Sequence, residues 1–238
     1  MSHDSFPQGG VDSLIVYGPM SHALTDFLDK VPPEISMIRI HGKTPPPARE
    51  FTWDINNVED LPDCLSHLQS SRPKPRIAFL GAGFMNQNRL LIQETTESVN
   101  LQIEANVLNY VRMTHTLLPH MVRSRFGRFV YLSSFRTKAV VRGTSIYSAS
   151  KAFGEAFFRS VGIENGRFGV TSASIRMGYF AGGLLSDVSV ERLAALKSQT
   201  SLGRLGTPED LSMAISYALN SEFTNGGVIE LEGGLSSL

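Results

Sequence analysis

The stretch RFVYLSS at residues 128–134, followed by YSASK at residues 147–151, decides the fold expected for this chain. Residues 128–132 are rich in aromatic and branched side chains and predict a buried strand, which ends at two serines. Residues 147–164 carry a helical pattern, so a strand, a loop and a helix follow one another. In a parallel sheet such a loop lies at the carboxyl ends of the strands, where ligands bind.

The same alternation of strand and helix extends outward in both directions. Strands are predicted at 14–17, 35–40, 51–53, 77–80, 128–132, 170–175 and 228–231, and helices at 21–30, 58–69, 96–124, 147–164, 190–197 and 208–219. Pro119 predicts a bend in the long helix, and Thr207 predicts the N-cap of the last helix, with Pro208 in its first turn. This order predicts an α/β fold, a Rossmann-like doubly wound parallel sheet of about seven strands with helices on both faces. Since no linker or repeat interrupts it, we expect a single domain over residues 1–238, with residues 1–12 as a flexible N-terminal segment.

The composition excludes several classes of protein. The 238 residues include 22 Lys+Arg and 22 Asp+Glu, so a net charge of zero argues against a nucleic-acid binder. A single cysteine, Cys64, excludes a disulfide within the chain and a cysteine-rich zinc site, and the six histidines show no metal-binding pair. No apolar run approaches the ~20 residues that span a bilayer, and the first residues lack the layout of a signal peptide. We therefore expect a cytoplasmic protein that binds a small molecule, with no metal, nucleic acid or membrane partner.

Tyr147 and Lys151 form the most informative pair in the chain. Their spacing of four places both side chains on one face of a helix, one turn apart. A phenol with a pKa of ~10 is a poor acid or base at neutral pH, and a nearby ammonium group lowers that pKa. Ser134 ends the preceding strand, where its hydroxyl can hold a carbonyl or alcohol oxygen. The competing interpretations are an ordinary amphipathic helix for the pair and a turn serine for Ser134.

These residues resemble the short-chain dehydrogenase/reductase family. The segment YSASK at 147–151 is similar to the family's Tyr-x-x-x-Lys signature, and Ser134 lies 13 positions before Tyr147, at the offset of the family's catalytic serine. Asn106 matches the family's helix asparagine, although it can also be read as a polar residue bridging the helix. The segments GRLGTPED at 203–210 and EGG at 232–234 resemble two further family marks.

The resemblance implies a role for each of these side chains. Tyr147 would be the general acid/base, and Lys151 would lower its pKa and contact the nicotinamide ribose. Ser134 would orient the substrate oxygen, and Asn106 would anchor a water that relays protons through Lys151. The implied reaction is hydride transfer between a nicotinamide and a carbonyl/alcohol pair, and the implied assembly is a homodimer or homotetramer.

The cofactor half departs from the family pattern. The segment YGPMSHAL at 17–24 keeps only one glycine of the family's Thr-Gly-x-x-x-Gly-x-Gly, because His22 and Leu24 stand where glycines are expected. The stretch between the second and third strands is short and holds three consecutive prolines, and Gly182 replaces a threonine that contacts the nicotinamide in the family. The positions that remain as candidate NAD(P) contacts are Gly18, Ser21, Arg39, Asp54, Ala82, Gly83 and Gly178.

Two of those candidates have equally simple alternatives. Asp54 matches the family's adenine-contacting aspartate, and a helix N-cap explains it as well. Arg39 is followed by His41 and Lys43, and these bases slightly favour NADP over NAD if a dinucleotide binds, although we favour solvated loop charges. On the substrate side, the apolar character of Phe135, Tyr179, Phe180 and Leu184 indicates an apolar substrate.

Three hypotheses follow from this mixture of intact and degenerate motifs. The first is an NAD(P)H-dependent oxidoreductase acting on a small carbonyl or alcohol. The second is a cofactor-independent isomerase, lyase or cyclase on the same fold, in which Tyr147, Lys151 and Ser134 transfer protons. The third is a non-catalytic binding subunit, against which the complete set of catalytic side chains argues.

Overall fold

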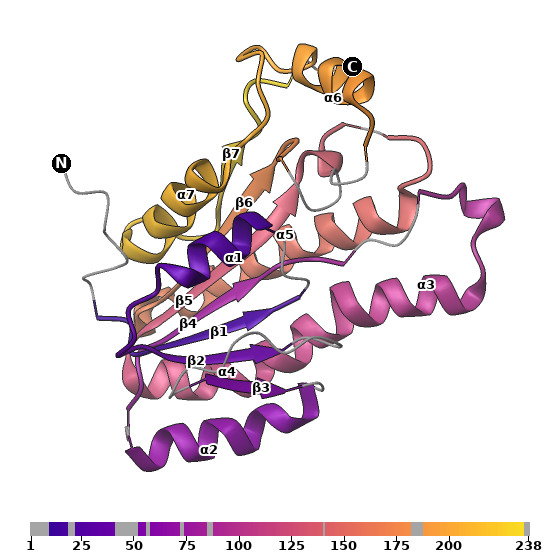
Figure 1. Cartoon of the computed structure of the whole chain (residues 1–238). Coiled ribbons are helices and arrows are strands. Elements are labelled where there is room, and N and C mark those ends of the chain that lie inside the picture. Colours follow the sequence, from indigo (N-terminus) through magenta and orange to yellow (C-terminus); the bar gives the residue numbers. More distant parts are fainter. Residues whose placement is uncertain are drawn as a thin grey trace.

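The computed structural model describes residues 10–18, 22–40, 52–55, 58–71, 74–84, 88–139, 141–181 and 188–235. Its centre is a seven-stranded sheet in which every neighbouring pair of strands is parallel, in the order β3-β2-β1-β4-β5-β6-β7 (Figure 1). The strands are β1 (Ser13–Tyr17), β2 (Ser36–Ile40), β3 (Thr52–Ile55), β4 (Ile77–Gly81), β5 (Gly127–Ser134), β6 (Val170–Met177) and β7 (Gly227–Leu231). The predicted doubly wound α/β fold is confirmed.

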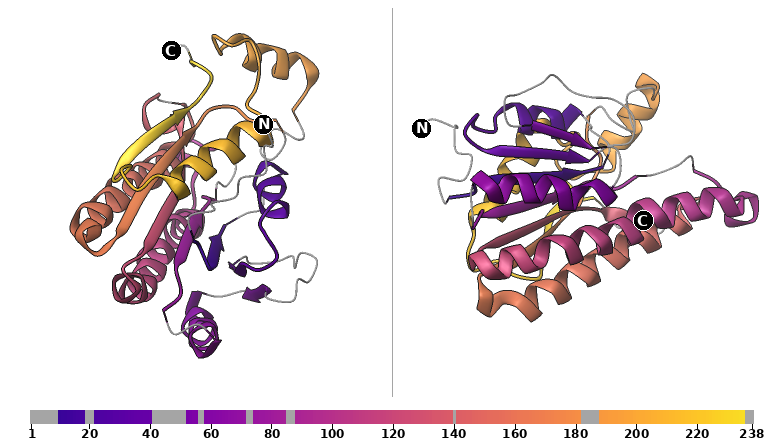
Figure 2. Two further views of the ribbon diagram at one scale, coloured as in Figure 1. Left: turned by 90° about the vertical axis from the view of Figure 1, so that its left-hand side faces the viewer. Right: turned by 90° about the horizontal axis from the view of Figure 1, so that it is seen from below.

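Helices cover both faces of this sheet. They are α1 (His22–Asp29), α2 (Leu61–Ser71), α3 (Thr96–Ile103), α4 (Asn109–Ser124), α5 (Ser145–Asn165), α6 (Val190–Ser198) and α7 (Pro208–Asn220), with a π-helical turn at Glu104–Leu108 and short 3-10 turns at Val58–Asp60, Leu91–Gln93, Phe135–Thr137 and Gly166–Phe168. Helices α1 and α7 lie together on one face, and α2, α4 and α5 lie on the other (Figures 1 and 2). Figure 2 also shows α3 and the start of α5 extending side by side beyond the sheet.

Burial on both faces explains the apolar strands. In β1, Leu14 and Val16 belong to the core under α1 and α7, whereas Ile15 belongs to the core under α2, α4 and α5. In the second core, Tyr110 of α4 and Phe158 of α5 make ring contacts with the aromatic side chains of β4 and β5. These contacts hold α4 and α5 against β4 and β5. A strand buried on both faces is typical of a parallel sheet.

The long helix predicted at 96–124 is irregular at a different place from the one expected. Helix α4 continues through Pro119, which lies on its exposed side, where water can bind the carbonyl that proline leaves without a partner. The irregular turn is instead the π-helical turn at Glu104–Leu108. Such turns insert an extra residue and are frequent at functional sites. Here the turn carries Asn106, which is fully buried.

The predicted N-cap of α7 is confirmed. The Thr207 hydroxyl accepts from the Asp210 amide at 3.2 Å, and the Asp210 carboxylate accepts from the Thr207 amide at 2.8 Å. Arg204 forms a bidentate ion pair with the same carboxylate, in which its two terminal nitrogens lie 2.6 and 3.0 Å from the two carboxylate oxygens. Hydrogen bonds from Arg204 and Thr207 hold the pKa of Asp210 at about 2.

Among the residues that the structure describes, no helix is both long and apolar enough to cross a membrane. Within the same ranges, no group of three His, Cys, Asp or Glu side chains is placed to hold a metal ion.

We predict that Asp210→Asn destabilises the fold by about 1 kcal/mol at neutral pH, the usual cost of losing a helix cap. The folded-state pKa of Asp210 lies below its unfolded value, so its stabilisation is present above pH ~4 and is lost as the pH falls toward ~2. Urea denaturation of both proteins from pH 7 to pH 2.5 measures this. The difference between them should shrink with falling pH, and a constant difference would contradict the assignment.

Candidate active site

The strand order reverses between β1 and β4, and the crevice outside their carboxyl ends is where a doubly wound sheet binds ligands. Gly18 follows β1 with a φ of 108°, and a Cβ there would lie 2.1 Å from the Ala82 carbonyl oxygen. The Ala82 amide donates to the Tyr17 carbonyl at 2.8 Å, which draws the two segments together. Gly18 is therefore required by the close approach of the chain after β4.

The amine of Lys151 is the most buried functional group at this edge. Its side chain projects from α5 and is 1% exposed, and Nζ donates to the Leu132 carbonyl of β5 at 2.5 Å. The same nitrogen lies 4.7 Å from the centre of the Tyr131 ring and 5.8 Å from that of Tyr147. Burial lowers the pKa of Lys151 to about 7, against an opposing effect of the Glu155 carboxylate. The amine can therefore gain or lose a proton near neutrality.

Asn106 fixes the chain segment that follows β4. Its Oδ1 accepts from the Phe84 amide at 2.8 Å, and its Nδ2 donates to the Phe84 carbonyl at 2.6 Å. A Cβ on Gly83 would lie 2.0 Å from Nζ of Lys151 and 3.2 Å from Oδ1 of Asn106. Gly83, Asn106 and Lys151 therefore meet at one point. The amide group expected to anchor a water is engaged with the backbone of Phe84.

Tyr147 lies one turn before Lys151 on α5 and is 9% exposed. Burial raises its pKa, while the charge of Arg136 and a hydrogen bond with Ser134 act to lower it. The guanidinium carbon of Arg136 lies 5.8 Å from the centre of the Tyr147 ring. In this structure the cation that favours the phenolate is thus Arg136, which the sequence analysis missed. A basic residue two places after Ser134 was the available signal.

The predicted substrate-side residues divide into two groups. Phe135 and Tyr179 bring their rings together, with centroids 4.9 Å apart, directly after Ser134 and β6. Phe180 instead packs against the core under α1 and α7, and its ring occupies the space that a Cβ on Gly206 would fill. Leu184 lies outside the described residues. Of the four predicted residues, Phe135 and Tyr179 therefore form an aromatic pair.

The predicted cofactor positions other than Gly18, Ala82 and Gly83 are dispersed. Arg39 lies inside β2 at 5% exposure, with Nε donating to the Met37 sulfur at 3.0 Å, so the interpretation as a solvated loop charge is wrong for this residue. Gly178 donates to the Leu231 carbonyl, and a Cβ there would lie 2.7 Å from Cα of Glu232, so it permits β6 and β7 to approach. Asp54 is opposite Arg39 in the strand register.

Several of the sequence predictions fall outside the described structure. Ser21, His41, Lys43, the proline-rich segment within 41–51 and Gly182 lie outside the described residues, as do the side chains of His22 and Asp54. Leu24, which replaces a family glycine, is described. It is fully buried in the core under α1 and α7.

The donor groups at this edge suit the nicotinamide-ribose end of an NAD(P) molecule. Within the described residues, the Lys151 amine, a group with up to three N–H donors, donates to one acceptor, the Leu132 carbonyl. Because Gly83 has no side chain, that amine packs directly against the backbone of the segment after β4. Lys151, Tyr147 and the backbone of Ala82 and Gly83 are the groups that would hold the ribose.

We predict that Gly83→Ala disrupts this site without unfolding the protein. The added methyl group would meet the Lys151 amine at 2.0 Å and displace it from the Leu132 carbonyl. The matched control is Gly227→Ala, because that glycine has no heavy atom within 4 Å of its Cβ position. Crystal structures and thermal melts of both variants test this. An undisturbed Lys151 in Gly83→Ala would contradict the described convergence.

Comparison with known proteins places residues 22–236 in one family. Residues 22–236 match the family model described as "Enoyl-(Acyl carrier protein) reductase". The 3-oxoacyl-(acyl-carrier-protein) reductase of Pseudomonas aeruginosa is 24% identical over 184 residues, covering 76% of this chain and 74% of the relative. The human 3-oxoacyl-(acyl-carrier-protein) reductase is 25% identical over 185 residues, covering 78% of this chain and 76% of the relative.

Solved structures with the same fold cover nearly the whole chain. ElxO with NADP bound has a TM-score of 0.81 at 16% identity, over 94% of this chain and 98% of its own. Ligand-free aldohexose dehydrogenase from Thermoplasma acidophilum has a TM-score of 0.82 at 15% identity, over 95% and 94%. The fold, the arrangement of Ser134, Tyr147, Lys151 and Asn106, and the family match agree: the chain belongs to the short-chain dehydrogenase/reductase family of NAD(P)-dependent oxidoreductases.

Proposed function

We propose that this protein interconverts a carbonyl and an alcohol on a small molecule, with NADPH or NADP as its redox partner. The observation that carries the proposal is the convergence of Tyr147, Ser134 and Lys151 at the carboxyl edge of the sheet, beside the side-chain-free backbone of Gly83. This arrangement combines a proton donor, an oxygen-orienting hydroxyl and a titratable amine in one water-poor site.

Each side chain has a role that follows from its surroundings. When bound, the reduced cofactor supplies the hydride. Ser134 orients the carbonyl oxygen and Tyr147 donates a proton to it, so that hydride and proton together give the alcohol. Lys151, whose pKa is about 7, can return a proton to Tyr147 and bind the ribose. Arg136 stabilises the phenolate while Tyr147 is deprotonated.

NADPH is favoured over NADH by the solved relatives rather than by Arg39. ElxO has the same fold and is described with NADP and, in a second structure, with NADPH bound. Arg39, the base expected to favour the 2′-phosphate, is buried within β2 beside Met37. The choice between the two cofactors is therefore part of the test.

The substrate side favours an apolar or acyl substrate. The Phe135–Tyr179 ring pair supplies an aromatic wall next to Ser134. Relatives in Pseudomonas aeruginosa and in human are named 3-oxoacyl-(acyl-carrier-protein) reductases. A 3-oxoacyl thioester is therefore the first substrate to assay, followed by simple apolar ketones.

We also propose that the protein forms a homodimer or homotetramer through the outer sides of α3, the π-helical turn and α5. Large apolar side chains are exposed there: Leu101 by 51%, Leu108 by 42% and Ile163 by 68%. Burying them against a second copy would remove apolar surface from water.

A cofactor-independent proton-transfer enzyme is the second candidate. The observation that favours it is Leu24, which fills core space on α1 where the family pattern has a glycine. In that case Tyr147, Lys151 and Ser134 would catalyse an isomerisation, elimination or cyclisation without hydride transfer.

Titration of the protein with NADPH and NADH, followed by fluorescence or calorimetry, tests the proposal. We expect saturable binding, tighter for NADPH. An absence of binding at millimolar concentrations of both cofactors would contradict the oxidoreductase and leave the cofactor-independent enzyme.

Tyr147→Phe then tests the role of the phenol. We expect NADPH affinity to change by no more than about threefold, while carbonyl reduction falls by about 100-fold or more, because general acid catalysis is lost. Tyr217→Phe is the control, since Tyr217 is an exposed tyrosine of α7 that hydrogen bonds to Thr224. Activity that survives in Tyr147→Phe would rule out proton transfer by Tyr147 in either candidate function.

A further inference from the structure

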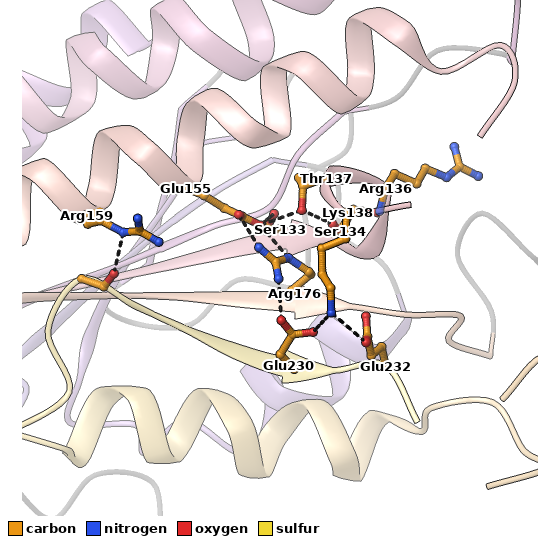
Figure 3. Close-up of polar contacts among 11 residues, drawn as sticks. Ser133, Ser134, Arg136, Thr137, Lys138, Glu155, Arg159, Arg176, Glu230 and Glu232 are labelled. Atoms are coloured by element: carbon orange, nitrogen blue, oxygen red, sulfur yellow. Dashed lines mark hydrogen bonds and ion pairs between the residues drawn. The ribbon is translucent and has the colours of Figure 1, made fainter. Parts of the chain in front are cut away.

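Glu155 continues the stripe of functional residues along α5. It lies one turn after Lys151 and two turns after Tyr147, on the same side of the helix. Its side chain is 11% exposed. The carboxylate accepts from the Ser133 hydroxyl at 2.6 Å and is bound by Arg176 at 2.7 and 3.1 Å (Figure 3). Donors from β5 and β6 therefore hold this buried carboxylate in a fixed position.

Two successive turns of α5 thus contact two successive residues of β5. Lys151 donates to the Leu132 carbonyl, and Glu155 accepts from Ser133. The helix and the strand are consequently fixed in register at the point where the reaction takes place.

Glu155 also reaches the turn beyond Ser134. The Thr137 hydroxyl lies 3.0 Å from Oε1 of Glu155 and 3.0 Å from the Ser134 carbonyl oxygen. The residues on both sides of Ser134 are therefore tied to a single carboxylate. Figure 3 shows Ser133, Thr137 and Arg176 converging on it, with Arg136 turned away.

The ion pairs that surround Glu155 extend to the edge of the sheet. Arg176 of β6 is 12% exposed in its side chain and also binds Glu230 of β7 at 2.5 Å, and Lys138 binds Glu230 at 2.9 Å and Glu232 at 3.4 Å. Burial alone would raise the pKa of Glu155, but hydrogen bonds from Arg176 and Ser133 hold that pKa below its usual value. Glu155 is thus ionised at neutral pH.

We propose that Glu155 is a positioning residue for the reaction: its carboxylate holds the turn around Ser134 in place through Ser133 and Thr137, and it places a negative charge one helical turn from the buried amine of Lys151. The effect of Glu155 on the reaction rests on the proposed function. Its contacts with the Ser134 turn and its effect on the charge of Lys151 exist in the protein without cofactor.

The electrostatic part follows from what surrounds the Lys151 amine. The Tyr131 ring faces it from β5, the Tyr147 ring faces it from α5, and Asn106 and Gly83 lie on a further side. Glu155 lies one turn further along α5. Among the described residues, Glu155 is the acid whose charge raises the pKa of this lysine. The charges beyond Glu155 are Arg176, Lys138, Glu230 and Glu232.

The first experiment measures the pKa of Lys151 by NMR of cofactor-free protein that carries isotope-labelled lysine. We expect Glu155→Gln to lower this pKa by roughly one unit, because the nearby negative charge is removed. Glu230→Gln is the matched control: it makes the same change and also removes an ion pair of Arg176, but Glu230 lies on β7, with ion pairs to Arg176 and Lys138. It should leave the pKa within about 0.2 units of the unaltered protein. Equal pKa values in all three proteins would overturn the electrostatic part.

The second experiment separates charge from position. Glu155→Asp keeps the charge but shortens the side chain, so it should retain the pKa of Lys151 while lowering kcat for carbonyl reduction about tenfold through a misplaced Ser134. An unchanged kcat in both Glu155 variants would overturn the positioning role, and if Glu155→Gln fails to fold, Glu155→Asp alone decides it. If the unaltered protein reduces no carbonyl, the proposed function fails, and the NMR comparison still decides whether Glu155 controls Lys151.

Discussion

The burial of one amine determines how the candidate site is built. Lys151 is enclosed by α5, β5 and the segment after β4, and each enclosing group restricts the sequence in a different way. Gly83 must lack a side chain because Nζ occupies its Cβ position. Asn106, buried within the π-helical turn, holds Phe84 in place through two hydrogen bonds. A buried amine is costly unless it is paired, which accounts for the Leu132 carbonyl and the nearby carboxylate of Glu155.

The fold and the acid-base half of the site could be predicted from the sequence because they depend on local patterns. Strand and helix periodicity identified all seven strands, and the spacing from Ser134 to Lys151 identified three side chains that the structure brings together. The Thr207 cap was also predictable, since capping depends on residues within one helical turn.

What could not be predicted depends on contacts between distant segments. Glu155 could not be identified from the sequence, because its partner Arg176 lies 21 residues away and contacts it only when β6 pairs with β5. Arg39 was assigned to a solvated surface, but pairing with β1 and β3 places it inside the sheet. The irregular turn of the long helix was expected at Pro119 and lies at Glu104–Leu108, where the buried Asn106 binds the backbone of Phe84, 22 residues earlier in the chain.

The central claim is that the buried amine of Lys151, beneath Gly83, forms the floor of a nicotinamide site. A crystal structure of the protein with NADPH tests it most directly. The account predicts the nicotinamide ribose beside Gly83, within hydrogen-bond distance of the Lys151 amine and the Tyr147 hydroxyl. NADPH bound elsewhere on the molecule, with the space above Lys151 filled by protein side chains, would contradict it.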